Sequence, residues 1–291
     1  MEMKKGLVLE GGAMRGMFTA GILDVWMEKG ITFDGAAGVS AGAVFGCNFK
    51  SGQKGRAIRY NKKYCTDPRY ASYRSLFTTG NIFGVDFCYD ELPHVLDPWD
   101  QEAFKADPMD FYCVCTDIVT GKPVYHLCKR GDDRDIEWFR ASASMPLAST
   151  IVEIGGRKLL DGGVSDSIPL RFMEHKGYNR NVVILTQPLD YVKSKNNVLP
   201  LVKTMYRNYP GLIRAMEDRH LMYNKQTAYV REQELKGEAF VIRPPKALEI
   251  GHISKDPDEL QRVYDIGRLT AYETLDQVKA YLNKTEGSEE A

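Results

Sequence analysis

The first fifty residues alternate between strand-like and helix-like segments, and this order constrains the fold more than any other feature of the chain. Residues 5–10 form a short apolar run, and residues 15–29 repeat apolar side chains at helical spacing. Residues 33–39 are again strand-like, and residues 41–50 are rich in Ala and Gly, which suits a helix packed closely on a sheet. A strand–helix–strand–helix order is typical of a parallel sheet with helices on both faces. We therefore predict an α/β fold with a doubly wound, mainly parallel central sheet.

Residues 54–108 interrupt this regular pattern. The segment is rich in aromatic and basic side chains and contains several Asp-Pro steps, which is typical of a helical insertion or cap. Its part from Tyr60 to Arg74 would suit contact with a lipid headgroup layer, because Lys, Arg and Tyr are stable at such an interface. A solvated helical cap without membrane contact is the alternative.

The rest of the chain predicts further strands and long helical stretches. Strands are expected at residues 109–117, 122–127, 151–154, 158–160, 182–186 and 239–243, and helices at about 136–143, 200–234 and 257–282. The stretch 200–234 is expected to break at Pro210-Gly211. We predict one domain over residues 5–190 that includes the insertion at about 54–108, a C-terminal helical and strand region over 191–284 packed on it, and a disordered tail over 285–291.

Charge and cysteine content exclude several classes of protein. Lys plus Arg equals Asp plus Glu, at 39 each, so no net field attracts nucleic acid. No stretch approaches the roughly 18 apolar residues of a transmembrane helix, and the N-terminal apolar run is too short for a signal peptide. The six cysteines form no C-x-x-C pair, and Cys113 and Cys115 read as packed thiols on one face of a strand. We expect a cytoplasmic protein with no nucleic-acid partner, disulfide, metal or cofactor, for which peripheral membrane contact stays open.

The run Gly38-Val39-Ser40-Ala41-Gly42 stands where the second strand should give way to the second helix. A serine between two glycines at such a turn holds its hydroxyl out for attack, with a strained backbone and with glycines that make room. The pattern occurs by chance in about one in ten chains of this length, so the surrounding sequence must support it. It indicates Ser40 as a candidate nucleophile.

A glycine-rich loop, Glu10-Gly11-Gly12-Ala13-Met14-Arg15-Gly16, lies between the first strand and the first helix. Its free N–H groups and the positive end of the helix favour binding of an anion. The loop lacks the Lys and the hydroxyl of a P-loop, and Ala13 replaces the second glycine of the dinucleotide fingerprint, so nucleotide binding is disfavoured. The oxyanion of an acyl-transfer intermediate is the better candidate, with Arg15 adding positive charge.

A nucleophilic serine also needs a base, and none of the five histidines stands in a recognisable triad pattern. The run Asp161-Gly162-Gly163 ends an apolar hairpin and delivers a carboxylate into a tight turn, although Asp-Gly is also a common hairpin-turn signal. Asp117 and Asp166 are the rival carboxylates. We expect Asp117 to order a turn and Asp166 to cap the next helix.

Taken in this order, the three blocks at residues 10–16, 38–42 and 161–163 resemble the patatin-like phospholipase family, whose pattern is a glycine-rich oxyanion loop, a G-x-S-x-G turn and a D-G-G/A turn. Residues 141–146 are similar to the A-S-x-x-x-P segment that precedes the last turn in family members. Ala13 departs from the pattern, since many members have a glycine there, and the departure matters only if the position needs a positive φ. The later helices resemble a bacterial branch of the family with an additional C-terminal helical region.

The resemblance implies a three-layer α/β/α fold, with residues 5–190 as the catalytic domain and with Ser40 and Asp161 as a dyad that works without histidine. The residues implied for the oxyanion hole are Gly11, Gly12, Ala13, Met14, Arg15 and Gly16, and those implied to support the turns are Gly38, Gly42, Gly162 and Gly163. A free Asp has a pKa of about 3.9, so the site must raise that pKa or tighten the hydrogen bond as the reaction proceeds.

The activity implied by the resemblance is hydrolysis of carboxylic esters on a lipid or another acyl ester, through an acyl-enzyme and without a metal. The alternatives are an acyltransferase with the same dyad, which differs only in the acceptor of the acyl group, and a non-catalytic lipid-binding or regulatory protein.

Overall fold

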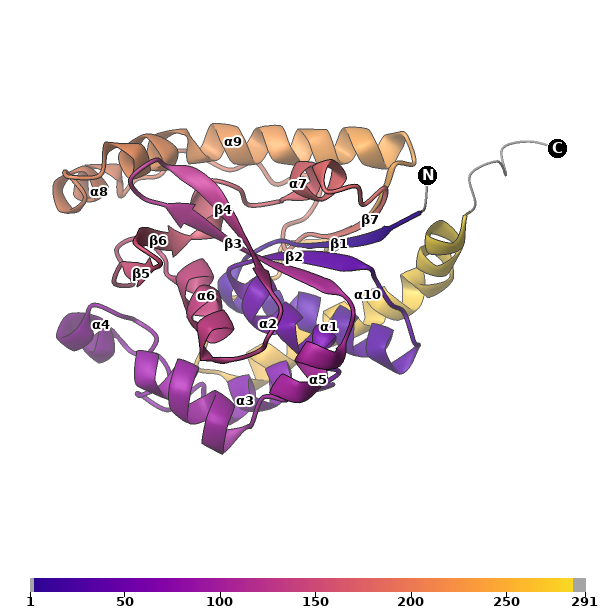
Figure 1. Cartoon of the computed structure of the whole chain (residues 1–291), viewed down its shortest axis with the longest axis horizontal. Coiled ribbons are helices and arrows are strands. Elements are labelled where there is room, and N and C mark those ends of the chain that lie inside the picture. The colour runs from indigo at the N-terminus through magenta and orange to yellow at the C-terminus, as the bar shows by residue number, and fades with distance from the viewer. Residues whose placement is uncertain (1–2, 285–291) are drawn as a thin grey trace.

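A sheet of eight strands lies at the centre of the molecule, with helices on both of its faces (Figure 1). The computed structural model describes residues 3–284. The strand order is β5-β6-β3-β2-β1-β7-β8, and β4 pairs with β3. The strands are β1 (Lys5–Leu9), β2 (Gly35–Val39), β3 (Asp110–Asp117), β4 (Lys122–Cys128), β5 (Val152–Ile154), β6 (Arg157–Asp161), β7 (Arg180–Ile184) and β8 (Ala239–Ile242). Neighbours from β3 through β2, β1 and β7 to β8 are parallel, whereas β4, β5 and β6 pair antiparallel, so the predicted mainly parallel sheet is confirmed.

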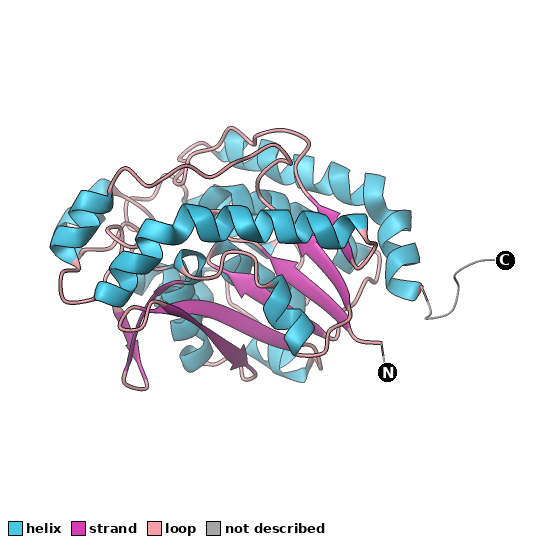
Figure 2. Cartoon of the chain, turned by 90° about the horizontal axis from the view of Figure 1, so that it is seen from above, coloured by secondary structure: helices cyan, strands magenta, loops and turns pink. Residues whose placement is uncertain are grey.

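Alternate residues of the central strands face two different helical layers, as the two-residue repeat of a strand requires. In β1, Leu7 and Leu9 belong to one core and Val8 to the other. The helices over the first core are α1 (Gly16–Glu28), α2 (Ala41–Lys50) and α10 (Pro257–Asn283), and those over the second are α7 (Leu170–His175) and α9 (Pro210–Leu235). Figure 2 shows the second layer, with one long helix running across the strands. The fold is therefore the expected three-layer α/β/α arrangement.

Shorter helical elements complete the chain. They are η1 (Ala13–Arg15), α3 (Arg56–Tyr64), α4 (Tyr73–Thr79), the π-helix η2 (Phe87–Leu96), α5 (Gln101–Ala106), α6 (Asp133–Ala143), η3 (Gly162–Val164) and α8 (Leu199–Met205). Helix α2 has its predicted bounds, and α10 begins at the predicted residue, where the Asp256 carboxylate accepts N–H bonds of the first turn. The predicted break at Pro210-Gly211 is present, because α8 ends at Met205 and Pro210 begins α9, where a proline needs no N–H partner in the first turn.

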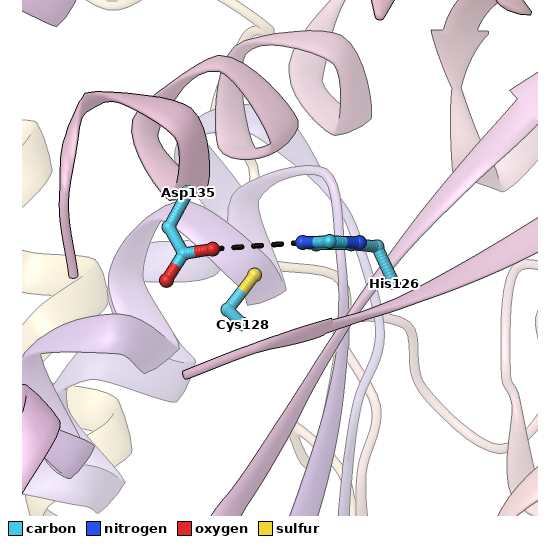
Figure 3. A group of neighbouring side chains, drawn as sticks. All are labelled: His126, Cys128 and Asp135. Atoms are coloured by element: carbon cyan, nitrogen blue, oxygen red, sulfur yellow. Dashed lines mark ion pairs between the residues drawn. The ribbon is translucent and has the colours of Figure 1, made fainter. Parts of the chain in front are cut away.

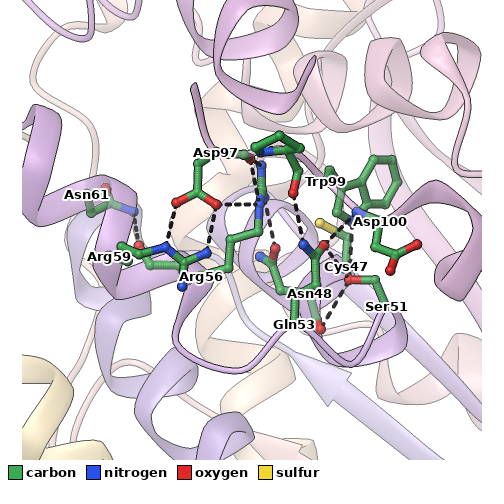
Figure 4. Close-up of polar contacts among 12 residues, drawn as sticks. Cys47, Asn48, Ser51, Gln53, Arg56, Arg59, Asn61, Asp97, Trp99 and Asp100 are labelled. Carbon is green, nitrogen blue, oxygen red and sulfur yellow. Dashed lines mark hydrogen bonds and ion pairs between the residues drawn. The ribbon is translucent and has the colours of Figure 1, made fainter. Parts of the chain in front are cut away.

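Residues 54–108 lie between α2 and β3 as a helical insertion that holds α3, α4, η2 and α5. Arg56 ties this insertion to the end of α2 (Figure 4). The buried guanidinium of Arg56 donates hydrogen bonds to the carbonyl of Asp97 and to Oδ1 of Asn48, and lies 3.5 Å from the Asp97 carboxylate. The more exposed Arg59 donates two hydrogen bonds of 2.7 Å to the same carboxylate. Asp97 is therefore compensated by two cations at the base of the insertion.

The aromatic side chains at the start of the insertion are buried, which contradicts the expectation that residues 60–74 as a whole face a headgroup layer. Tyr60, Tyr64 and Tyr70 are each less than a tenth exposed. The rings of Tyr64 and Tyr70 both pack edge-on against Phe87. These aromatic residues belong to the first core, and the exposed aromatic side chains of this segment begin only at Tyr73.

The C-terminal region packs on the same core. Strand β8 extends the parallel sheet beside β7, and α10 lies against α1 (Figure 1). The predicted tail at residues 285–291 lies outside the described residues. Within residues 3–284, no helix is both long enough and apolar enough to span a lipid bilayer.

Candidate active site

Ser40 occupies a strained turn between β2 and α2. Its backbone has φ 55° and ψ −121°, a conformation that residues other than glycine rarely adopt. The flanking glycines allow the turn to pack closely. A Cβ on Gly42 would lie 2.4 Å from the carbonyl oxygen of Leu9, and one on Gly38 would lie 2.7 Å from Cα of Ala43. The structure thus contains the strand-to-helix turn that the sequence predicts at this serine.

Strand β3 brings Asp161 beside Ser40. Because β4 occupies one edge of β3 along nearly its whole length, β2 and β6 must share the other edge. On that edge Val39 pairs with Val114, and Asp161 pairs with the next residue, Cys115. The end of β6 therefore meets the end of β2, and two residues 121 positions apart in the sequence become neighbours.

The two side chains are in direct contact. Ser40 Oγ donates a hydrogen bond of 2.7 Å to Asp161 Oδ2, and the N–H of Gly163 donates one of 2.7 Å to Oδ1. Asp161 is 6% exposed, and burial raises the pKa of its carboxyl despite the hydrogen bond from Ser40 and the nearby charge of Arg219. A carboxylate in contact with a hydroxyl, and with a pKa raised toward neutrality, is suited to accept the hydroxyl proton.

Strand β3 holds the backbone around both Ser40 and Asp161 through the carbonyl group of Val114. Ser40 N–H donates a 2.8 Å hydrogen bond to Ser142 Oγ, which itself donates one of 2.6 Å to the carbonyl of Val114. A Cβ on Gly162 would lie 2.2 Å from that carbonyl oxygen, so only glycine fits there. Ser142 lies in the predicted 141–146 segment and links it directly to the serine turn.

The glycine-rich loop lies against Ser40, since a Cβ on Gly11 would lie 2.9 Å from the serine Cβ. Among the described residues, no hydrogen bond engages the N–H groups of Gly12 and Ala13, and both residues line the cavity beside the hydroxyl. Ala13 has φ 49°. The position therefore does require a positive φ, which a glycine would adopt at a lower energy.

The remaining loop residues lie in different surroundings. Met14 is buried and lines an apolar cavity, whereas Arg15 lines a wider cavity of mixed polarity. Gly16 begins α1 and lines neither cavity. The residues expected to form one anion-binding group are thus divided, and Gly12 and Ala13 carry the N–H groups open to a ligand.

Two cavities meet at Ser40. The narrower one, of about 80 Å³, has a mainly apolar and aromatic lining that includes Met14, Val44, Phe45, Tyr60, Phe83 and Leu92. The wider one, of about 610 Å³, has a lining of mixed polarity that includes the charged side chains of Arg15, Asp161, Lys193 and Arg219. Ser40, Ala13 and Met145 line both cavities. Such a pair suits an amphiphile whose apolar and polar parts diverge at the attacked atom.

No histidine in the described part of the chain hydrogen-bonds to the Ser40 hydroxyl, whose partner is Asp161. His252 lines the wider cavity, and burial lowers the pKa of its imidazole. Asp161 is therefore the side chain that is placed to act as a base.

The sequence model of the family described as "Patatin-like phospholipase" matches residues 7–173, more than half of the chain. The chain belongs to this family. A second model, described as a domain of unknown function (DUF6363), matches residues 209–283, which include α9, β8 and α10. The predicted family and its additional C-terminal helical region are both confirmed.

Relatives of this patatin-like chain include a protein of Escherichia coli K12 named "Uncharacterized protein YjjU", which is 28% identical over 90% of this chain and 74% of its own length. A "Lysophospholipase nte1" of Aspergillus terreus is 30% identical over 61% of this chain, and this match spans only 11% of the fungal protein. Among solved structures, VipD from Legionella pneumophila is similar with a TM-score of 0.49 and 11% identity, over 95% of this chain and 67% of VipD.

The patatin-like chain also holds a group of potential metal ligands away from Ser40 (Figure 3). His126, Cys128 and Asp135 offer ligand atoms that all lie within 4.8 Å of one another. Asp135 Oδ2 already accepts N–H bonds of 2.8 Å from Arg130 and Gly131, and its Oδ1 lies 3.5 Å from His126 Nε2. None of the three lines the cavities at Ser40, and a closed zinc site takes four protein ligands. The group links β4 to α6, and we assign it no catalytic part.

The rival carboxylates have other partners. Asp117 accepts N–H bonds from the turn that follows β3, as predicted. Asp166 does not cap the next helix, since α7 has no side-chain cap, and that prediction is wrong. Asp166 is buried instead and accepts hydrogen bonds from the hydroxyl of Tyr125 and the amide of Gln226, because the chain turns its side chain inward before α7 begins.

Sequence reasoning missed the residues that the C-terminal region contributes to the site. Lys193, Arg219 and His252 line the wider cavity, and the hydroxyl of Tyr223 donates a 2.6 Å hydrogen bond to the buried carboxylate of Glu10. They come from α9 and from two separate loops, so no local spacing marks them as a group. Only the tertiary structure, in which α9 and the two loops meet at the cavity, identifies these residues as a group.

Proposed function

We propose that this chain is a serine lipid acyl hydrolase in which Ser40 is the nucleophile and Asp161 the base. The observation that carries the proposal is the 2.7 Å contact from Ser40 Oγ to a buried carboxylate, at the point where an apolar cavity meets a wider one lined in part by charged side chains. A hydroxyl becomes a useful nucleophile when a base within hydrogen-bond reach takes its proton. Membership of a phospholipase family supports the same reaction class.

The reaction begins when Asp161 accepts the Ser40 proton as Oγ attacks the ester carbonyl carbon. The carbonyl π electrons move to the oxygen, and the N–H groups of Gly12 and Ala13 stabilise the oxyanion. Collapse of the intermediate expels the alcohol, which takes the proton from Asp161, and leaves an acyl-Ser40 ester. Asp161 then deprotonates a water molecule that attacks this ester, and returns the proton to Ser40 as the carboxylic acid leaves.

The cavities indicate how the ester lies at the nucleophile. The acyl chain enters the narrower cavity, because its mainly apolar lining matches a hydrocarbon. The alcohol part then occupies the wider cavity, whose lining includes charged side chains. A single-chain or accessible acyl ester of a lipid fits this division, and the lysophospholipase name of the fungal relatives supports a lipid substrate.

A fluorophosphonate probe tests the proposed nucleophile, since it phosphonylates only an activated serine. We expect labelling of the wild-type protein and none of Ser40→Ala. Ser75→Ala, a change on the peripheral helix α4, serves as the matched control and should label like the wild type. Absence of labelling from the folded wild-type protein would refute the proposed chemistry.

We further propose that α4 and α8 rest on the lipid surface that supplies the substrate. Tyr73 and Phe77 on α4 are 70% and 86% exposed, and Leu201 and Met205 on α8 are 51% and 61% exposed. Both helices lie at the same end of the molecule (Figure 1), and Tyr73 also lines the wider cavity. Exposed apolar side chains around the mouth of a lipid site favour contact with a bilayer.

Flotation with phospholipid vesicles tests this surface. Phe77→Glu combined with Met205→Glu should reduce the bound fraction several-fold. Leu269→Glu alters an equally exposed leucine on α10 and should leave binding unchanged. Equal binding of the two variants would exclude α4 and α8 as the docking surface.

A further inference from the structure

The wider cavity collects positive side chains from distant parts of the chain. Arg15 comes from the turn before α1, Lys193 from the loop after β7, Arg219 from α9, and His252 from the loop before α10. All four line the same chamber as Ser40. Such convergence in one cavity differs from the scattered lysines and arginines of an ordinary protein surface.

In the part of the chain that the structure describes, no carboxylate forms a close ion pair with the cationic cluster, although Glu10 and Asp161 line the same cavity. Within residues 3–284, no ion pair joins Arg15, Lys193 or Arg219 to an acidic side chain. Glu10 is buried and accepts hydrogen bonds from Thr186 and Tyr223, and burial raises the pKa of its carboxyl.

The cationic groups themselves have unused donors. Nε of Arg15 is buried and has no hydrogen-bond partner. Arg219 donates through Nε to the carbonyl of Gly163 at 2.7 Å, which holds its guanidinium near Asp161. Unpaired charge in a partly buried cavity is costly unless an anion compensates it.

The titration of the cluster agrees with this geometry. Burial, together with the charges of Arg219 and Arg15 and against the opposing effect of Glu10, lowers the pKa of Lys193 to about 8. Burial also lowers the pKa of His252, assisted by Arg15, Arg219 and Lys193. An anion bound among these groups would relieve the repulsion between them.

We infer that Arg15, Lys193, Arg219 and His252 form a binding subsite for a phosphate group carried on the alcohol side of the acyl ester. The inference rests on the proposed function and narrows it, because it selects phosphate-bearing acyl esters such as lysophospholipids over neutral glycerides. Arg and Lys are the side chains that hold phosphate oxygens through charge-assisted hydrogen bonds. Arg219 and His252 lie within the region that matches the domain of unknown function. The inference therefore gives this region a function in recognition of the polar headgroup.

The position of the subsite follows from the two cavities. When the acyl chain fills the narrower cavity, the carbonyl carbon lies at Ser40 and the alcohol part projects into the wider one. A phosphate on that alcohol then lies among the cationic side chains. The anchored headgroup would hold the ester in position for attack.

A pair of substrates with one acyl chain tests the subsite, namely a lysophospholipid and the matching monoacylglycerol. In Lys193→Gln, the ratio of kcat/KM for the phosphate-bearing ester to that for the neutral ester should fall at least about tenfold, the effect of losing one charge-assisted hydrogen bond. Lys195→Gln removes an exposed lysine two residues further along and should leave the ratio unchanged. An unchanged ratio in Lys193→Gln would overturn the inference.

A direct binding measurement separates this inference from the proposed chemistry. Ser40→Ala cannot form an acyl-enzyme, and its binding of a non-hydrolysable ether lysophospholipid can be followed by calorimetry. We expect binding that weakens at least about tenfold when Lys193→Gln is added. Inorganic phosphate should compete for the site if free phosphate is a ligand, and should fail to compete if the headgroup needs its lipid. Binding of the ether lipid that is insensitive to Lys193 would refute the subsite even if Ser40 proves to be the nucleophile.

Discussion

The hydroxyl of Ser40 donates a 2.7 Å hydrogen bond to Asp161, whose carboxylate is held on its other oxygen by the N–H of Gly163. This geometry predicts that Ser40→Ala and Asp161→Asn each lower kcat for a neutral short-chain ester by at least about 10³-fold, because removing either member of a nucleophile–base pair disables the unit. Stopped-flow measurement of the acylation burst provides the readout.

The matched controls for this prediction are the histidines. Replacing each one by Gln, His252 included, should lower the burst rate by less than about tenfold, because the proposed base is a carboxylate. A histidine variant as inactive as Asp161→Asn would contradict the dyad.

The buried environment of Asp161 predicts the acid limb of the pH profile. Asp161 must be ionised to accept the serine proton, and burial raises the pKa of its carboxyl. As pH falls through that raised pKa the base is protonated, so kcat/KM for a neutral ester should decline at a pH above the ordinary carboxyl value of about 3.9. A profile that stays flat down to that value would show that Asp161 is not the titrating base.

Replacing Arg56 and replacing Arg59 should affect stability differently. Both side chains compensate the Asp97 carboxylate, but Arg56 is buried and Arg59 is half-exposed. Arg56→Met leaves buried acceptors of Asp97 and Asn48 without a donor and should lower the free energy of unfolding by about 3 kcal/mol. Arg59→Met removes a half-exposed partner and should cost less than about 1 kcal/mol. Urea denaturation measures the free energy of unfolding of both variants. Equal losses would mean that the burial of the arginine does not determine how much stability its replacement removes.

The positive φ of Ala13 predicts how the loop tolerates substitution. Ala13→Gly should keep the esterase activity and change stability by less than about 1 kcal/mol, because relief of backbone strain is offset by a more flexible unfolded chain. Ala13→Val should lower both the activity and the stability, since a β-branched side chain is poorly accommodated at φ 49°. Activity assays and thermal unfolding provide the measurements, and a fully active, stable valine variant would argue against a fixed loop conformation.

Much of the site could be predicted because its chemistry is encoded locally. The turn at Ser40 and the glycine-rich loop each follow a strand, and the carboxyl ends of neighbouring parallel strands meet at one edge of a sheet. Asp161 was more difficult to predict, since its antiparallel strand reaches the site through pairing with β3. Its Asp-Gly-Gly turn was still visible, because Gly162 must pass close to Val114.

Other features could not be predicted, because the same local residue pattern is compatible with more than one structural environment. The aromatic side chains of Tyr60 and Tyr70 lie among basic residues whether they face a membrane or, as here, the core. Asp166 stands where a helix cap would, but Tyr125 and Gln226 provide stronger partners for its carboxylate. Lys193 joins the cavity only through tertiary packing.

The shared edge of β3 also determines when a growing chain acquires its reactivity. Synthesis from the N-terminus delivers Ser40 long before Asp161, and the two meet only after β6 has emerged and paired beyond the end of β2. An unfinished chain therefore carries the serine without its proposed proton acceptor. Recovery of the proposed esterase activity during refolding would consequently time the closure of this long-range strand pair, a step that helix content alone does not report.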